Sequence, residues 1–147
     1  MFLTSCAVQH PRAAHESHPN EIADNPAILY DGTVPREQLT LHAIKLGDSE
    51  TAIAESHIEN HGTAGWIVCD NRARYRIENG KIVTLGVWDP RILNKLNIHS
   101  PADIETHFGK PQSIDTANPL LIYNYDSGHI TVLWDTTEEH VDAINIK

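Results

Sequence analysis

Ser100-Pro101-Ala102-Asp103-Ile104 is the stretch that decides the fold, because a related stretch, Ser49-Glu50-Thr51-Ala52-Ile53, precedes it in the chain. The Ser and the Ile of the two stretches share one offset, 49 to 100 and 53 to 104. Each stretch can begin a short helix capped by its serine. Strand-like sequence follows both and finishes on a Trp-Asp pair, at Trp88-Asp89 and Trp134-Asp135. The pattern predicts an α+β fold of two tandem units, each a short helix packed on antiparallel β-hairpin strands.

Turn and cap residues place the hairpins and the second helix. Asn79-Gly80 favours a type I′ hairpin turn, in which both central residues need a positive φ. In the second unit, Gly109 ends the helix in the left-handed conformation, and Pro111 prevents the helix from resuming. Alternating apolar residues predict the strands at 66–69, 73–77, 81–87, 120–125, 129–135 and 141–146.

The chain of 147 residues has the size of one compact domain. We expect a single α+β domain at 37–147, with unit 1 at about 37–89 and unit 2 at about 90–147. Residues 1–36 are rich in Pro, His and turn formers and have little apolar periodicity. Such a segment buries too little apolar surface to offset the entropy of ordering, so it is predicted to be a flexible tether.

The N-terminus contains a candidate localisation signal, Leu3-Thr4-Ser5-Cys6, which resembles the lipobox of bacterial lipoproteins. In that family the Cys becomes the lipid-anchored first residue, which here is Cys6. The charged and apolar segments that precede a lipobox are absent, so the start is lipobox-like but truncated. An upstream start predicts an envelope lipoprotein at the periplasmic face of the outer membrane. Without one, the tetrapeptide is a coincidence in a cytoplasmic protein.

The charge of the chain argues against nucleic acid as a partner. Twenty acidic and eleven basic side chains give a net charge of −9, which repels a phosphate backbone. Arg72, Arg74 and Arg76 recur at period two and would form one stripe on a strand face. A solvated face is the simpler interpretation of this stripe, and a binding stripe is the alternative.

The second unit resembles the SmpA/OmlA (BamE-like) lipoproteins. The resemblance lies in the helix that starts at Ser100 and ends Phe108-Gly109-Lys110-Pro111, in the Tyr-bearing strand at 121–125 and in the strand at 130–135 that ends in Trp-Asp. The β-lactamase-inhibitor-like fold is similar, and it implies a helix-plus-sheet unit in tandem. The first unit departs from this pattern, since Asn60-His61-Gly62 stands where Gly-x-Pro is expected. We transfer no binding residue.

The sequence contains no nucleophile elbow, P-loop, dinucleotide fingerprint, zinc-protease motif or EF-hand. His57 and His61 would share one helical face, but no third metal ligand accompanies them. Cys69 lies in an apolar run and is predicted to be a buried core residue. Asp103, Glu105 and His107 are typical of a solvated helix face. We therefore predict no catalytic residue, no metal and no cofactor.

The sequence is rich in residues that define helices, turns and strands, and it lacks catalytic motifs. This combination favours a non-enzymatic protein-binding module, an adaptor or inhibitor, most simply a small envelope lipoprotein. Its partner would be another protein, and it would reach a membrane only through a lipid on Cys6. The alternatives are a cytosolic immunity-type inhibitor of a basic toxin and a small hydrolase or metal-dependent enzyme. We expect contact through the exposed sheet face or through the hairpin loops, whose candidate residues are Asn79, Gly80, Asp126, Ser127 and Gly128.

Overall fold

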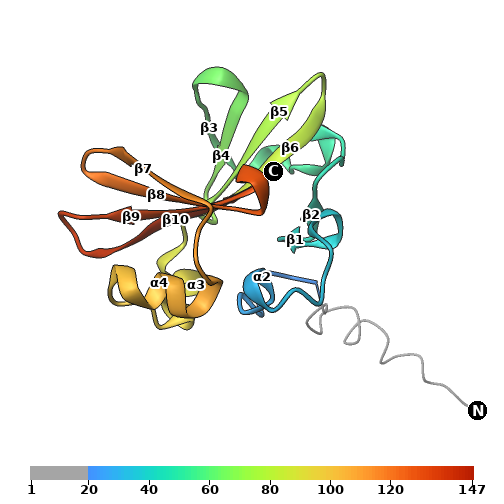
Figure 1. Ribbon diagram of the computed structural model, residues 1–147. Coiled ribbons are helices and arrows are strands. Elements are labelled where there is room, and N and C mark those ends of the chain that lie inside the picture. The colour runs from blue at the N-terminus through green and yellow to red at the C-terminus, as the bar shows by residue number, and fades with distance from the viewer. Residues whose placement is uncertain (1–19) are drawn as a thin grey trace, which may run out of the picture.

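The structure is a computed structural model that describes residues 20–147 (Figure 1). It is an α+β fold dominated by one antiparallel sheet whose strands lie in the order β3-β4-β5-β6-β10-β9-β8-β7. Two antiparallel meanders, β3 to β6 and β7 to β10, are joined where β6 pairs with β10. We call this junction the seam. The strands are β3 (Ile58–His61), β4 (Trp66–Cys69), β5 (Ala73–Glu78), β6 (Lys81–Val87), β7 (Ser113–Ala117), β8 (Leu120–Tyr125), β9 (Ile130–Asp135) and β10 (His140–Ile146).

Short helices cover one face of the sheet. Figure 1 shows α2 (Ile28–Asp31), α3 (Pro90–Leu93) and α4 (Pro101–Phe108) on the same side, together with the small hairpin of β1 (Thr40–Leu41) and β2 (Ile44–Lys45). None of the helices within residues 20–147 is long and apolar enough to cross a membrane. Single 3-10 turns occur at Arg36–Gln38, Glu50–Ala52, Glu55–His57, Thr63–Gly65, Asn94–Leu96 and Asp126–Gly128.

The strand register separates the two faces of the sheet. Residues directly opposite each other in a sheet share a face, so the register can be followed from strand to strand. One such line carries the core and is buried or partly buried throughout: Ile67, Tyr75, Leu85, Ile146, Ile130 and Tyr125. The neighbouring line crosses all eight strands on the other side: Asn60, Val68, Arg74, Gly86, Asn145, Thr131, Asn124 and Ser113. We call this second side the open face.

The second half of the sequence folds largely as its local signals predict. The hydroxyl of Ser100 accepts a hydrogen bond from the backbone N–H of Asp103 at 3.3 Å, and α4 then runs to Phe108. Gly109 follows with φ 85°, although its ψ of −174° is extended and not left-handed helical. Three predicted strands are present as β8, β9 and β10. The edge strand β7 was not predicted, because all five of its residues are exposed and show no apolar alternation.

The first predicted helix is wrong. In its place are two single 3-10 turns, Glu50–Ala52 and Glu55–His57, followed directly by the edge strand β3. Ser49 does cap the first of these turns, because its side chain accepts a hydrogen bond from the N–H of Thr51. The N–H of Glu50, however, donates to the carbonyl of Gly80 at 2.9 Å. The segment is therefore tied to the β5–β6 turn. Two tandem helix-plus-hairpin units are not confirmed.

The predicted flexible tether also needs correction from residue 20 onward. Ile22 is fully buried, and Ile28 and Leu29 of α2 are buried in the same core. The segment pairs with β1, since Ile22 N–H donates to the Thr40 carbonyl at 2.8 Å and Thr40 N–H donates to Asn20 at 2.9 Å. The few apolar residues of this segment are enough to order it, because they are buried in the core against the sheet. Cys6 and the rest of residues 1–19 lie outside the described part of the chain.

Candidate functional site

An arginine lies across the middle of the open face, next to the seam. The Arg74 guanidinium is 4.8 Å from the ring centroid of Trp66, and its Nη2 donates to Asn145 Oδ1 at 3.4 Å. Its Nε is buried and has no hydrogen-bond partner among the described residues. Burial lowers the pKa of Arg74, and the negative charge of Asp142 opposes that shift. Arg74 is thus a partly desolvated cation without an ion-pair partner in the described chain.

Gly86 of β6 makes room for this arrangement. A Cβ at Gly86 would lie 2.6 Å from Arg74 Cγ and 2.9 Å from Asn145 Oδ1. Real Cβ atoms do not approach other atoms this closely, so the glycine lets Arg74 lie flat over the seam. The open face therefore has a defined centre rather than a row of solvated side chains.

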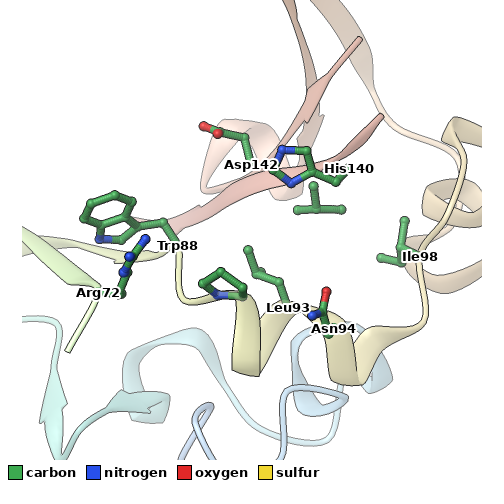
Figure 2. Close-up of a pocket in the computed structure, with 9 residues that line it drawn as sticks. Arg72, Trp88, Leu93, Asn94, Ile98, His140 and Asp142 are labelled. Atoms are coloured by element: carbon green, nitrogen blue, oxygen red, sulfur yellow. The ribbon is translucent and has the colours of Figure 1, made fainter. Parts of the chain in front are cut away.

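A cavity of about 270 Å³ opens beside the seam (Figure 2). Arg72 stands over Trp88 at 5.3 Å from the ring centroid, and the Trp88 indole Nε1 is buried without a hydrogen-bond partner among residues 20–147. Polar groups of β10 face apolar groups of the α3 region across the cavity. Its lining consists of Arg72, Trp88, Pro90, Leu93, Asn94, Ile98, His140, Val141 and Asp142.

The three arginines do not form the single stripe that the sequence predicts. Arg72 precedes β5 in a turn with φ 61°, whereas Arg74 lies over the seam. Arg76 is paired within its own strand, with its Nη1 2.7 Å from Glu78 Oε2, and its Nε donates to the Ala64 carbonyl at 3.1 Å. Each cation thus has a different environment.

The two predicted contact loops lie at the same end of the sheet. Asn79 and Gly80 form the β5–β6 turn with φ 52° and 74°, as predicted for a type I′ hairpin. The loop at Asp126, Ser127 and Gly128 joins β8 to β9. Asp126 is held by Arg36, with 2.6 Å between Oδ2 and Nη1, and Ser127 N–H donates to the Gln112 side chain. A shallow cavity of about 370 Å³ extends from Ser127 and Gly128 to Arg76, Glu78 and Lys147.

The histidine pair and the cysteine occupy other surroundings. His57 lies in a 3-10 turn and His61 in β3, so they share no helical face. His57 Nδ1 is 3.2 Å from Asp70 Oδ1 on the exposed surface. Cys69 is buried, as predicted, and burial raises the pKa of its thiol, with Asp70 and Glu59 adding to the shift. A raised pKa keeps the sulfur as the thiol, which is the less nucleophilic form.

The acidic and histidine residues of α4 have contacts of their own. Asp103 accepts from the His99 N–H at 2.8 Å, and this bond lowers the pKa of its carboxyl group. The ring of His107 packs on Tyr30, with 5.3 Å between centroids, whereas Glu105 is exposed. Asp103 and His107 thus each contact another part of the chain, and no hydrogen bond or ion pair joins the two among the described residues.

The comparisons with known proteins concern the fold. No protein-family model matches the sequence, and no curated protein matches it. The fold is similar to that in the crystal structure of a DUF4309 family protein (YjgB) from Bacillus subtilis subsp. subtilis str. 168 at 2.13 Å resolution. The match has a TM-score of 0.58 and 13% sequence identity, and it covers 86% of this chain and 95% of that chain. The likeness extends to the fold, and it supplies no function for the cavity or the open face.

Proposed function

We propose that the protein is a non-enzymatic protein-binding module, an adaptor or inhibitor, that binds its partner across the open face of the sheet. The observation that carries this proposal is the line of residues that crosses all eight strands, all exposed or half-buried except Gly86, with the Arg74–Trp66 stack at its centre. The helices α2, α3 and α4 lie on the opposite side, so none of these helices covers the open face (Figure 1).

The size of the open face suits a protein partner. Eight strands spaced about 4.8 Å apart give a face roughly 34 Å wide. With strands about 17–20 Å long, the face offers on the order of 600 Å² before its loops are counted. A standard protein interface takes about 800 Å² from each partner. The open face supplies most of that area, and the two loops at its end add to it.

The residues on the open face define the chemistry of the partner. Trp and Arg are the side chains that most often dominate the free energy of binding at protein interfaces. Arg74 has no ion-pair partner in the described chain. Apolar Val68 lies directly opposite it on β4, and apolar Leu133 lies on the same face in β9. The complementary surface carries an acidic side chain for the Arg74 guanidinium, with apolar side chains on both sides. A carboxylate can accept two parallel hydrogen bonds from a guanidinium.

The finer part of the proposal concerns the cellular location of the protein and the evolutionary origin of its fold. The lipobox-like Leu3–Cys6 supports a small envelope lipoprotein anchored through Cys6, and an in-frame start upstream of Met1 would test it. A cytosolic immunity-type inhibitor would use the same face. The two four-stranded meanders support an ancestral duplication in which 3-10 turns replace the first helix. The resemblance to the SmpA/OmlA and β-lactamase-inhibitor-like proteins rests on the same two halves.

The first prediction locates the binding face by photo-crosslinking in cells. A photoreactive phenylalanine replaces Thr131, which lies on the open face, or Glu105, which is exposed on α4. We expect a discrete crosslinked protein from position 131 and none from position 105, read by mass spectrometry. The same product from both positions, or no product from position 131, would contradict the proposal.

A matched pair of variants then tests the role of the arginine. Arg74→Ala should weaken binding of the crosslinked protein, once purified, by about tenfold or more, because it removes the central cation. Lys110→Ala removes one cation beyond the end of α4 and should leave the affinity unchanged. Circular dichroism confirms that both variants are folded. Equal affinities for the two variants would show that the open face is not the interface.

A further inference from the structure

Three side chains with metal-binding groups converge where β9 meets β10. Asp135 ends β9, and His140 and Asp142 lie in β10, where His140 is directly opposite Asp135. One ligand atom of each residue lies within 4.8 Å of the ligand atoms of the other two. A shift in register between Val141 and Ala143 leaves Asp142 as an extra residue in β10. This bulge brings Asp142 beside the Asp135–His140 pair.

The three groups keep lone pairs free for a ligand. Asp135 uses Oδ1 to accept the N–H groups of Thr137 at 2.8 Å and Glu138 at 2.9 Å, which leaves Oδ2 unbonded. Among the described residues, the side chains of His140 and Asp142 form neither a hydrogen bond nor an ion pair. Asp135 Oδ2 and the side chains of His140 and Asp142 therefore lie together without hydrogen-bond partners among the described residues.

The cavity beside the seam provides the remaining space. His140 and Asp142 both line it, and Figure 2 shows their side chains at one rim, across from Leu93 and Ile98. A volume of about 270 Å³ accommodates water molecules, which complete the coordination of an ion held by three protein ligands. The cluster thus borders the cavity through His140 and Asp142, whereas Asp135 is not one of the lining residues.

We propose that Asp135, His140 and Asp142 bind a divalent transition-metal ion, with zinc as its most accessible representative. An imidazole with two carboxylates suits borderline ions such as Zn²⁺ or Mn²⁺, whereas Ca²⁺ and Mg²⁺ favour sites made of oxygen ligands alone. A dication also relieves the repulsion between the two aspartates in a chain with a net charge of −9. Arg72 lines the cavity and the charge of Arg74 interacts with that of Asp142, so these two cations weaken the binding of the ion.

The second prediction tests this site with zinc chloride alone, added to the full chain. Backbone amide NMR should show shifts centred on residues 135–142, and calorimetry should show a single saturable zinc ion there. His140→Ala and Asp142→Asn should each weaken this binding by about tenfold or more, because each removes one of three ligands.

The control is Glu138→Gln, which removes the same charge as Asp142→Asn from an exposed residue of the adjoining turn. Zinc affinity should be unchanged in this control. The proposal is overturned if the NMR shifts centre on other histidines, such as His57, or if His140→Ala and Asp142→Asn bind zinc as the unaltered chain does. It is also overturned if calcium is bound in preference to zinc. The outcome is independent of protein binding by the open face.

Discussion

Glu21 is the most unusual single residue of the core, because its carboxylate is buried at 5% exposure without a cation beside it. Its two oxygens accept from the backbone N–H groups of His42 at 2.6 Å and Ala43 at 2.9 Å, and from the Thr40 hydroxyl at 3.1 Å. His42 and Ala43 have φ values of 53° and 68°, which side chains with a Cβ rarely adopt. The carboxylate holds the β1–β2 turn in this conformation.

The third prediction is that Glu21→Gln lowers the free energy of unfolding by about 2–3 kcal/mol. The amide keeps one acceptor oxygen but presents an NH₂ group to donors, so at least one backbone N–H of the turn loses its partner. Urea denaturation followed by tryptophan fluorescence measures the change. Glu55→Gln, an isosteric change at an exposed residue, should have no effect. Equal unfolding midpoints for the two variants would show that the carboxylate contributes nothing.

Residue-level features were predictable where the signal was local. Burial of Cys69 followed from its apolar neighbours, and the left-handed pair Asn79-Gly80 from its residue types. Glu21 carried no such signal, because a glutamate in a polar segment is usually solvated, and its partners are about 20 positions away. Asp135, His140 and Asp142 were missed for a related reason, since a β-bulge that sequence periodicity does not reveal brings them together.

At the scale of elements, β5, β6 and β10 depend on a glycine at their junction. The fourth prediction is that Gly86→Ala destabilises the protein by about 1–3 kcal/mol, because its Cβ would overlap Arg74 Cγ at 2.6 Å. The same change should displace Arg74 from Trp66 and alter tryptophan fluorescence in the folded state.

A double-mutant cycle separates this clash from the intrinsic effect of alanine in a strand. In the Arg74→Ala background, Gly86→Ala should cost clearly less, because the obstructing side chain is shorter. Urea unfolding of the four proteins gives the interaction energy. Additive effects would mean that the destabilisation by Gly86→Ala arises within the strand and not from a clash with Arg74.

Helices and strands were predicted best where the capping residues or the alternation of apolar residues indicate the same element that the tertiary contacts favour. Ser100, Pro101 and Gly109 bound α4 through contacts within a few residues, and β6 has the predicted bounds of Lys81–Val87. The first helix failed although Ser49 caps as expected, because the N–H of Glu50 is bound to Gly80, about 30 positions later. Trp88 and Trp134 are not equivalent either. Trp88 follows the fourth strand of its meander, and Trp134 lies inside the third strand of the other.

At the scale of the whole molecule, buried tyrosines make stability sensitive to alkaline pH. Burial raises the pKa of Tyr75 above its ordinary value, and it raises that of Tyr125 to about 12, with Glu105 and Tyr123 adding to the second shift. The folded state favours the neutral phenol, which donates from Tyr75 to the Leu41 carbonyl and from Tyr125 to the Gly109 carbonyl.

The fifth prediction follows from these shifts. An unfolded tyrosine ionises near pH 10, so the contribution of Tyr125 is complete below about pH 10 and is lost as the pH rises towards 12. The free energy of unfolding should therefore fall across that interval, and less steeply in Tyr125→Phe. Urea denaturation at a series of pH values measures it. Identical slopes for the two proteins, or tyrosinate absorbance showing all four tyrosines ionising near pH 10, would contradict this account.

The seam has a consequence for how the chain is made. β10 comes after every other described strand in the sequence, yet it lies between β6 and β9 in the middle of the sheet. While the nascent polypeptide emerges from the ribosome, β6 and β9 are therefore two unpaired edges, each able to pair with a strand from another chain. Synthesis stalled before His140 would leave two separate half-sheets. The late synthesis of β10 therefore leaves both edges open to pairing with other chains until translation of this strand is complete.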